Sequence, residues 1–374
     1  MRQEKLSQPP TNVIAFDAAS AEKGIMTSLR GALLALEHNP SLKIICVGKE
    51  KELGESLEAI LKKTPGNELA KRLEIANADE CVGMNEKPSL NVIRRKNTSI
   101  YKCVQFVVEG KADALVSPGN TGVTGLLASL KMGRLSWRNP SSFKDMFTVK
   151  PGLLARFPTY KGDEVSYLCD SGVVNDVDSQ TLSYFGLMMK PYLEKIDKKT
   201  NPRIALLNIG TEKGKGDLLY KETYGLLEKY AEKGLINFVG NQEPDDVLRH
   251  NADGFVCSAQ VGNIFTKAAE AVSRFYENQI KENYKSQMII VQALGGFSLG
   301  SIKDRLKEKL DLLKLGGGLL LGTKHKAIIT HGNADERELA GAILYSARIK
   351  DFNLNDEITN LLRETHWYSR LIRK

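Results

Sequence analysis

Short apolar runs recur along the chain, and each of them ends at or near a polar residue or a glycine. The runs are rich in Val, Ile and Leu and show little alternation between apolar and polar positions. Strands of a parallel sheet that is covered on both faces have this composition. We therefore expect strands at Val13–Phe16, Lys43–Val47, Ala114–Ser117, Ser166–Cys169, Arg203–Ile209, Ile236–Val239, Gly254–Cys257 and Ala327–Thr330.

Stretches with a helical period separate these runs, among them Thr121–Lys131, Asp217–Glu232 and Asp335–Lys350. Alternation of strand and helix implies right-handed crossovers and an open, doubly wound, mostly parallel sheet. The predicted fold class is therefore α/β, and we expect a single domain over residues 1–374. In a sheet of this kind, ligands bind in the crevice at the carboxyl ends of the strands.

The segment 263–315 departs from this rhythm because its pattern is almost entirely helical. Its last part combines basic positions from Lys303 to Lys314 with apolar positions at helical spacing, which are Ile302, Leu306, Leu310 and Leu313. One interpretation is an amphipathic helix that packs on its own domain. The other is a projecting helical hairpin used for dimerisation, protein docking or contact with a membrane surface. Residues 353–374 are predicted to form a C-terminal helix with a basic tail.

The composition is that of a globular protein, with 42% hydrophobic and 26% charged residues. Its net charge of +8 is weak for 374 residues, and the basic residues are not concentrated around aromatic ones, so no nucleic-acid partner is expected. No apolar run approaches the roughly 18 residues that cross a bilayer, and residues 1–12 lack the apolar centre of a secretory signal. The five cysteines are widely spaced without a C-x-x-C pair, which favours small buried side chains in a reducing cytoplasm.

Motifs of several common enzyme classes are absent. The sequence has no G-x-S-x-G, no H-E-x-x-H and no strand that runs into G-x-G-x-x-G. Gly317–Lys324 has the length of a P-loop, but its Gly-Thr-Lys order reverses the required Gly-Lys-Ser/Thr. Neither a nucleotide-dependent kinase nor a standard dehydrogenase is therefore expected, and we predict no metal site and no cofactor.

Loops rich in Gly and Asn follow several of the predicted strands. In Ser117–Gly122, glycines allow a ligand to approach the backbone, and the start of the next helix offers N–H groups to an anion. Comparable loops contain Asn208–Gly210, Gly240-Asn241, Gly262-Asn263 and His331–Asn333. Lys215 and His331 add positive or titratable charge, and no Ser or Cys is accompanied by an obvious base. We therefore predict one crevice that polarises an oxyanion without a covalent enzyme intermediate.

Short motifs spread over residues 13–349 resemble, in the same order, those of the bacterial phosphate acyltransferase (PlsX) family of phospholipid synthesis. The matching segments are Arg94–Ser99, Ser117–Gly122 with Gly133-Arg134, Asp170 with Gly172, Asn208–Glu212 with Lys215-Gly216, Ile236–Asn241, Gly262-Asn263 with Lys267 and Glu270, Gly316–Gly322, and His331-Gly332 with Asp335. That family is similar in fold to isopropylmalate dehydrogenases and phosphotransacetylases.

The resemblance implies conversion of a long-chain acyl-(acyl carrier protein) and orthophosphate to an acyl phosphate, with release of the carrier. It also implies a cytoplasmic homodimer whose projecting helices lie near the dimer interface and the membrane surface. The basic face from Lys303 to Lys314 suits an acidic carrier protein or peripheral contact with an anionic membrane.

On this interpretation, phosphate lies against the helix start, and one of its oxygens attacks the thioester carbonyl directly. Asn208, Asn241 and His331 are candidate donors to the developing oxyanion. The expected catalytic residues are His331, Asn208, Lys215 and Asp170, and the expected substrate-binding and phosphate-binding residues are Gly119, Asn120, Thr121, Gly122, Lys96, Asp176, Asn241 and Asn263. His331 could instead cap its own loop, and Lys96 could face solvent.

Three loops depart from the pattern of that family. Asp17–Glu22 lacks both glycines of Asp-Ala-Met-Gly-Gly-Asp, Val174 replaces an asparagine, and Ser258–Gln260 replaces Asp-Gly-Phe. Because residues with side chains avoid positive φ, we expect the first loop to have a different shape. The changes keep two alternatives open. One is a carrier-protein or membrane-surface binding module without turnover, and the other is a phosphotransacetylase-like enzyme that uses acyl-CoA.

Overall fold

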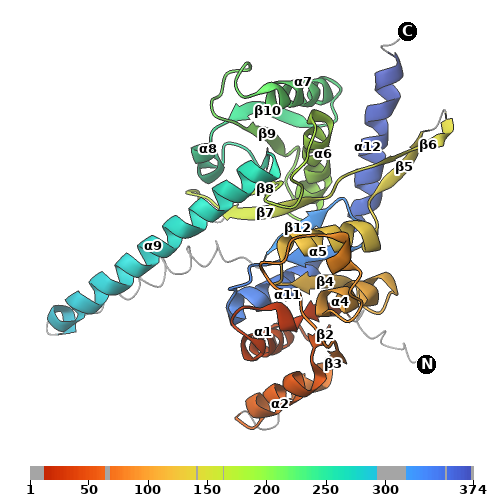
Figure 1. The fold of residues 1–374 in the computed structure, drawn as a ribbon. Helices are drawn as coiled ribbons and strands as arrows, with labels where there is room; N and C mark the ends of the chain where they lie inside the picture. The colour runs from red at the N-terminus through yellow and green to blue at the C-terminus, as the bar shows by residue number, and fades with distance from the viewer. Residues whose placement is uncertain are drawn as a thin grey trace, which may run out of the picture. The chain divides into compact units, whose positions relative to one another are not determined.

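The computed structural model describes residues 12–63, 68–139, 142–162, 164–292, 317–349 and 352–371. The chain folds into two compact units, each with its own β-sheet and helices (Figure 1). Unit 1 comprises Met1–Leu153, Lys195–Lys198 and Gly316–Lys374, and unit 2 comprises Leu154–Glu194 and Lys199–Leu315.

The sheet of unit 1 has the strand order β12-β13-β4-β1-β2-β3. Its strands are β1 (Asn12–Asp17), β2 (Leu42–Gly48), β3 (Leu73–Asn77), β4 (Ala114–Ser117), β12 (Gly318–Leu321) and β13 (Lys326–Ile329). Neighbouring strands are parallel except β12 and β13. In β1, Ile14, Ala15 and Phe16 are completely buried, as expected for a central strand that is covered on both faces.

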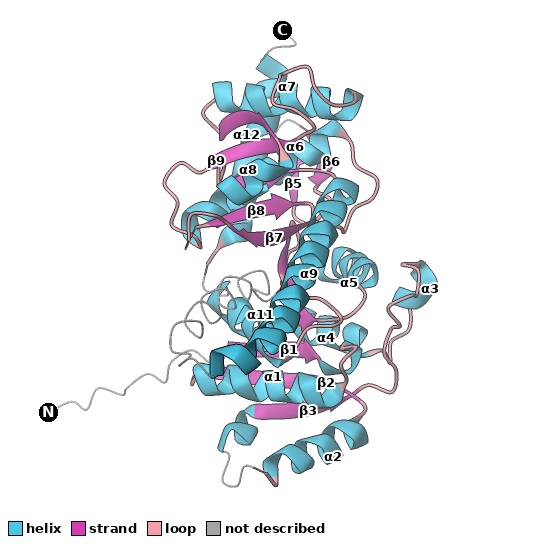
Figure 2. Ribbon diagram, turned by 90° about the vertical axis from the view of Figure 1, so that its left-hand side faces the viewer, coloured by secondary structure: helices cyan, strands magenta, loops and turns pink. Residues whose placement is uncertain are grey.

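Helices pack against this sheet, and Figure 2 shows α1 alongside its strands. The helices of unit 1 are α1 (Ile25–His38), α2 (Glu50–Leu61), α3 (Leu90–Ile93), α4 (Ser99–Val108), α5 (Thr121–Leu127), α11 (Glu336–Ile349) and α12 (Leu354–Leu371). A hairpin of β5 (Ser136–Asn139) and β6 (Ser142–Thr148) completes the unit. Gly31 lets α1 approach α11 closely, because a Cβ at this position would lie 2.8 Å from the Cβ of Leu339.

The sheet of unit 2 has the order β10-β9-β11-β8-β7, and only β7 is antiparallel to its neighbour. Its strands are β7 (Gly152–Pro158), β8 (Val165–Cys169), β9 (Arg203–Leu207), β10 (Asn237–Gln242) and β11 (Gly254–Val256). Its helices are α6 (Ser179–Lys195), α7 (Leu218–Glu232), α8 (Pro244–Arg249) and α9 (Ala259–Gln292).

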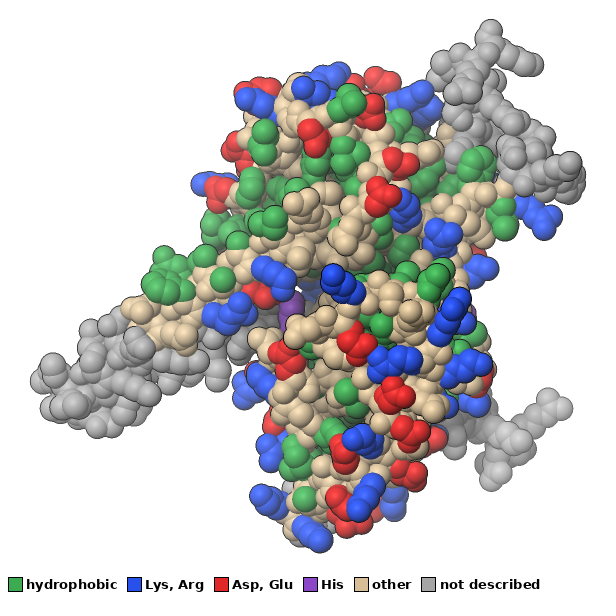
Figure 3. Space-filling model, viewed as in Figure 1, with side chains coloured by type: hydrophobic (Ala, Val, Ile, Leu, Met, Phe, Trp, Pro, Cys, Tyr) green, Lys and Arg blue, Asp and Glu red, His purple; other side chains and the backbone are tan. Residues whose placement is uncertain are grey.

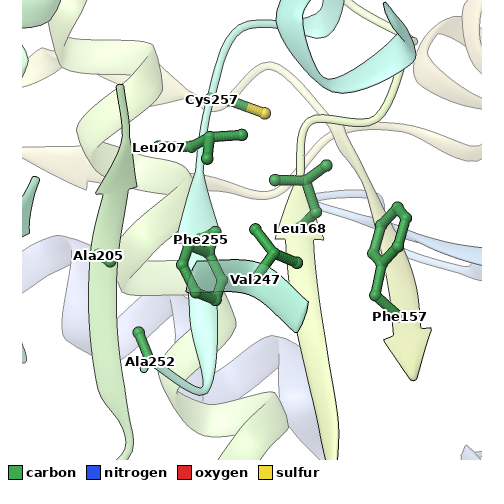
Figure 4. Packing of buried hydrophobic residues seen from close by; sticks show 8 residues of the cluster. All are labelled: Phe157, Leu168, Ala205, Leu207, Val247, Ala252, Phe255 and Cys257. Carbon is green, nitrogen blue, oxygen red and sulfur yellow. The ribbon is translucent and has the colours of Figure 1, made fainter. Parts of the chain in front are cut away.

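A compact apolar core lies on one face of this second sheet (Figure 4). Leu168 of β8, Phe255 of β11 and Val247 of α8 are its centre, and all three are completely buried. Phe265 of α9 packs on the same cluster, with its ring centroid 5.1 Å from that of Phe157. This packing fixes the first turns of α9 against the carboxyl ends of β8 and β11.

The predicted insertion at 263–315 begins as one long helix, α9, which extends away from the sheet of its own unit (Figure 1). Beyond Ala269, exposed apolar side chains include Val272, Phe275 and Tyr276. The remainder, with all the predicted apolar and basic positions from 302 to 314, lies outside the described residues. Among the described residues, no helix has both the length and the apolar composition to cross a bilayer.

The predicted α/β class is confirmed, and every predicted strand is present within a few residues. The run Arg203–Ile209 ends earlier than expected, at Leu207, because the amide N–H of Ile209 donates to the side chain of Asn208 at 2.8 Å. The predicted C-terminal helix is present as α12, and its tail at 372–374 lies outside the described residues. The sequence does not predict β3, β5, β6, β7 or β12. Polar or basic positions interrupt the apolar run in β3 and β7, whereas β12 is a run of only four residues.

The cysteine prediction was wrong at one position, because Cys81 is exposed while the other four cysteines are buried. Cys81 lies in a loop after β3 and outside any apolar run, so no strand carries it into the core. The net positive charge is not gathered into one patch on the face in Figure 3, where Lys and Arg are mixed with Asp and Glu. Charge alone therefore marks no binding surface on that face.

Candidate active site

Three loops of unit 1 meet at the carboxyl edge of its sheet. They follow β1, β4 and β13, which are adjacent parallel strands, so their ends share one edge. The backbone joins them directly, because Glu22 N–H donates to the carbonyl of Gly332 at 2.7 Å and Thr330 N–H donates to that of Ser117 at 2.9 Å. Two of the five predicted polar loops, Ser117–Gly122 and His331–Asn333, therefore meet within unit 1, and the other three belong to unit 2.

The loop after β4 leads into α5 through Asn120, which is the N-cap of that helix. Asn120 Oδ1 accepts from Val123 N–H at 3.1 Å, which satisfies one of the unpaired donors of the first turn. Its Nδ2 donates to the carbonyls of Met84 and Glu86 at 2.8 and 2.9 Å. The Asn120 amide therefore holds the segment 83–86 beside the loop, a role that the sequence did not reveal.

The start of α5 retains donors for a ligand. Thr121 and Gly122 are the first two residues of the helix, so their N–H groups have no acceptor within it. Gly122 also has a packing role, because a Cβ there would lie 2.6 Å from Pro88 Cγ. α5 continues directly into a π-helical turn, Ala128–Met132, so the dipole of a longer helix favours an anion at this end.

His331 follows β13 and is exposed at the same edge of unit 1. Its neighbour Gly332 is closely surrounded, because a Cβ there would lie 2.7 Å from Met84 Cε and 3.1 Å from Glu22 Oε1. The glycine thus allows the loops after β1 and β13 to touch. Because Gly332 is held between these loops, the position of the neighbouring His331 backbone is also fixed.

The basic segment Arg94–Ser99 precedes and begins α4. Its contact with the loop after β1 is made by Ser99, and not by Arg95 or Lys96. Arg95 is paired with Glu80 at 2.9 Å and with Glu86 at 2.6 Å, which fixes the turn. Lys96 is exposed on that turn. Ser99, at the start of α4, is buried, and its Oγ lies 3.5 Å from Ser20 Oγ in the loop after β1.

In unit 2, Asn208 directly follows β9 and Asn241 lies within β10, and their side chains form a hydrogen-bonded pair. Asn208 Nδ2 donates to Asn241 Oδ1 at 3.1 Å and to the carbonyl of Lys215 at 3.2 Å. Asn241 Nδ2 donates to the carbonyl of Glu212 at 2.8 Å. The pair therefore shapes the loop that presents Lys215, whose ammonium lies 3.6 Å from the Glu212 carboxylate.

A second group in unit 2 joins the ends of β8 and β11. The buried carboxylate of Asp170 accepts from the N–H groups of Gly172 at 2.9 Å and Val174 at 2.8 Å. Gly262 lies so close that a Cβ there would be 2.0 Å from the Asp170 carbonyl oxygen. Asn263 follows it, with its side chain 3.3 Å from the Cβ position of Gly172. Asp170, Gly172 and Asn263 are therefore neighbours, whereas Asp176 is exposed further along the loop.

Sequence reasoning missed Tyr220, which connects the two groups of unit 2. Its hydroxyl accepts from Ser258 N–H at 3.1 Å and lies 3.3 Å from Ser258 Oγ. Burial raises the pKa of Tyr220, so the phenol stays neutral around neutral pH. Ser258 belongs to one of the loops that differ from the family pattern. That difference was the one feature of the sequence that could have drawn attention to Tyr220.

Comparison with protein families places almost the whole chain in one group. Residues 12–356 match the family model described as "Fatty acid synthesis protein". A phosphate acyltransferase of Dictyoglomus thermophilum is 33% identical over 345 residues, which cover 92% of this chain and 96% of the relative. One of Fusobacterium nucleatum is 31% identical over 345 residues, covering 92% and 97% of the two chains.

Solved structures show a related fold at low sequence identity. A phosphotransacetylase from Streptococcus pyogenes gives a TM-score of 0.54 at 18% identity, covering 90% of this chain and 93% of its own. The EutD phosphotransacetylase from Staphylococcus aureus gives 0.53 at 18% identity, covering 92% and 96%. These likenesses support the α/β fold.

Proposed function

Because the chain belongs to the fatty acid synthesis protein family, we propose that it is a phosphate acyltransferase, an enzyme that transfers an acyl group to inorganic phosphate. The observation that carries this proposal is the identity with phosphate acyltransferases over nearly the full length of both chains. The changed loop Asp17–Glu22 belongs to the carboxyl edge of unit 1, where Glu22 N–H donates to the carbonyl of Gly332 in the loop after β13.

We assign phosphate to the helix start at Thr121 and Gly122. The N–H groups there and the helix dipole favour an anion. We propose that the imidazole of His331, which is exposed at the same edge of unit 1, also contacts it. Asn120 is a positioning residue in this assignment, because its amide is already occupied by the segment 83–86. Gly119 supplies backbone to the same turn, and Lys96 contributes long-range positive charge.

The reaction needs no covalent enzyme intermediate. One phosphate oxygen forms the new C–O bond with the thioester carbonyl carbon, and the C–S bond breaks as the tetrahedral intermediate collapses. The sulfur leaves as a thiolate and then takes a proton; with a thiol pKa of about 8.5, it requires little help from a general acid. Positioned donors stabilise the oxyanion, and we propose His331 of unit 1 for this role. Lys215 of unit 2 remains a proposed catalytic residue. Asn208, Asn241 and Asp170 hold loops, and Asp176 and Asn263 remain proposed substrate-binding residues.

We further propose that the acyl donor is carried by acyl carrier protein, and that the protein acts as a homodimer in the cytoplasm with peripheral contact to an anionic membrane. The exposed apolar side chains of α9, Val272, Phe275 and Tyr276, support an interface on that helix. These finer proposals rest on the family resemblance.

The donor is tested with purified protein, labelled phosphate and either a long-chain acyl-(acyl carrier protein) or a short-chain acyl-CoA. We expect labelled acyl phosphate with the long-chain carrier-bound donor. Product from acyl-CoA alone would instead favour a phosphotransacetylase-like enzyme. No product from either donor, with retained carrier binding, would favour a binding module.

The phosphate assignment is tested with Asn120→Ala. Loss of the N-cap and of the bonds to residues 83–86 distorts the helix start, so we expect kcat/KM for phosphate to fall by about a hundredfold. The matched control is Asn355→Ala, which removes an amide that donates to the Lys324 carbonyl elsewhere in unit 1. Equal activity of the two variants would remove the assignment.

A further inference from the structure

Asp17 is a buried carboxyl group at the carboxyl end of β1. It borders a narrow space of about 150 Å³ that is also lined by Ser20, Gly119 and Asn120. No part of this space is wide enough for a water molecule. The carboxyl group therefore lies beside the proposed phosphate turn, and its charge cannot be hydrated from that space.

One oxygen of Asp17 is tied to the turn after β4, and the other is not. Asp17 Oδ2 accepts from the hydroxyl of Ser117 at 2.8 Å. The same hydroxyl oxygen accepts from Gly119 N–H at 3.0 Å, so its hydrogen must point toward Asp17. Asp17 Oδ1 has no hydrogen-bond partner in the described part of the chain.

Electrostatics favour the neutral acid at this position. Burial raises the pKa of Asp17 above its ordinary value of 3.8, and the hydroxyls of Ser99, Ser117 and Ser20 offset this only in part. A proton would also turn the unpartnered oxygen into a hydroxyl group and remove an unsolvated charge.

The other titratable groups that face Asp17 bring no positive charge. The thiol of Cys103 on α4 interacts with Asp17, and the thiol of Cys46 on β2 interacts with Cys103. Burial raises the pKa of Cys46 to about 12 and that of Cys103 well above 9.0, so both stay neutral near pH 7. No basic side chain of the described residues contributes to the pKa of Asp17.

We propose that Asp17 is a positioning residue that fixes the Ser117–Gly119 turn for phosphate while adding no negative charge beside it. This rests on the proposed function, because the turn is the one assigned to phosphate. A neutral carboxyl group still accepts the Ser117 hydrogen bond and keeps the turn in shape. An ionised one would repel an incoming dianion across a region without water.

The test uses sulfate as the probe, because sulfate remains a dianion between pH 6 and pH 9 while phosphate titrates. Sulfate binding is measured by calorimetry for the wild type and for Asp17→Asn, which imitates the neutral acid. Any pH dependence that the two proteins share cancels in the ratio of their dissociation constants. A neutral carboxyl group and an amide carry the same charge, so we expect this ratio to be near one at pH 6 and pH 7.

Two further variants separate charge from positioning. Asp17→Ala removes the acceptor for Ser117, and we expect it to bind sulfate about tenfold more weakly than Asp17→Asn at every pH. Asp113→Asn makes the same substitution at the other end of β1, where Asp113 accepts from Val13 N–H. It should bind sulfate like the wild type, and thermal melting confirms that each variant is folded.

The proposal is overturned if Asn at position 17 weakens sulfate binding at all pH values, or if it binds sulfate several-fold more tightly than the wild type at pH 6 and pH 7, which would show that the wild-type carboxyl group is ionised. It is also overturned if the Ala and Asn variants bind sulfate equally. Because no turnover is measured, a protein that forms no acyl phosphate could still give the expected pattern. Failure of the proposed function is thus distinct from failure of this inference.

Discussion

At the scale of single residues, sequence motifs identified positions but not the contacts that give them their roles. Asn120, Asn208 and Asp170 were expected to meet substrate, yet each uses its side chain to hold the backbone of its own or a neighbouring loop. Polar residues at strand ends can serve either purpose, and only the geometry of their donors and acceptors separates the two. Asp17 had no signal beyond its place in a changed loop.

Gly262 gives the sharpest prediction at this scale. A Cβ at Gly262 would lie 2.0 Å from the Asp170 carbonyl oxygen, so Gly262→Ala must displace α9 or the loop after β8. We expect the free energy of unfolding to fall by about 3 kcal/mol or more, measured by urea denaturation. Gly225→Ala in α7 is the control, since nothing lies within 4 Å of its Cβ position and alanine favours a helix. Equal stability of the two variants would contradict the packing described here.

Asp253 predicts how acid affects unit 2. Burial alone would raise the pKa of Asp253, but hydrogen bonds from His250 and Arg203 outweigh it and hold this pKa well below its ordinary 3.8. A lowered pKa means that the ionised form stabilises the folded state above about pH 4, and that this stabilisation is lost as pH falls further. Asp253→Asn should therefore cost about 1–3 kcal/mol at pH 7, and the difference should shrink at pH 3. Urea denaturation at the two pH values measures it, and a constant difference would contradict the account.

At the scale of elements, apolar patterning located the buried strands well and their ends less well. The central strands of both sheets are nearly continuous apolar runs, and their burial on two faces produces that pattern. Edge and antiparallel strands such as β3 and β7 carry polar or basic positions, so their sequences resemble loops. Helix starts were predicted where a capping residue marks them, as at Asp217 before α7.

The cap of α7 provides the prediction for elements. Asp217 is the N-cap and its side chain accepts from Tyr220 N–H at 3.0 Å, so Asp217→Ala removes this bond and the favourable charge at the helix start. We expect a loss of about 1 kcal/mol in the free energy of unfolding, with little loss in Asp217→Asn, which keeps an acceptor. A large effect in the Asn variant would show that charge, and not capping, dominates.

At the scale of the whole molecule, the chain forms two α/β units whose segments alternate along the sequence. Local patterning does not reveal such a division, because the same strand and helix rhythm runs through both units. We nevertheless predict that the chain behaves as a single domain and unfolds in one cooperative calorimetric transition. Two separate transitions would contradict that prediction. In the same measurement, phosphate should raise the melting temperature, because it binds the folded state.

The central claim is that inorganic phosphate itself attacks the acyl thioester. Its most direct measurement is the release of carrier thiol from a long-chain acyl-(acyl carrier protein), followed as phosphate is varied and compared with acyl phosphate formed. We predict that thiol release requires phosphate, saturates with it, and equals acyl phosphate mole for mole. Thiol release at the same rate without phosphate, or none at any phosphate concentration, would contradict the account.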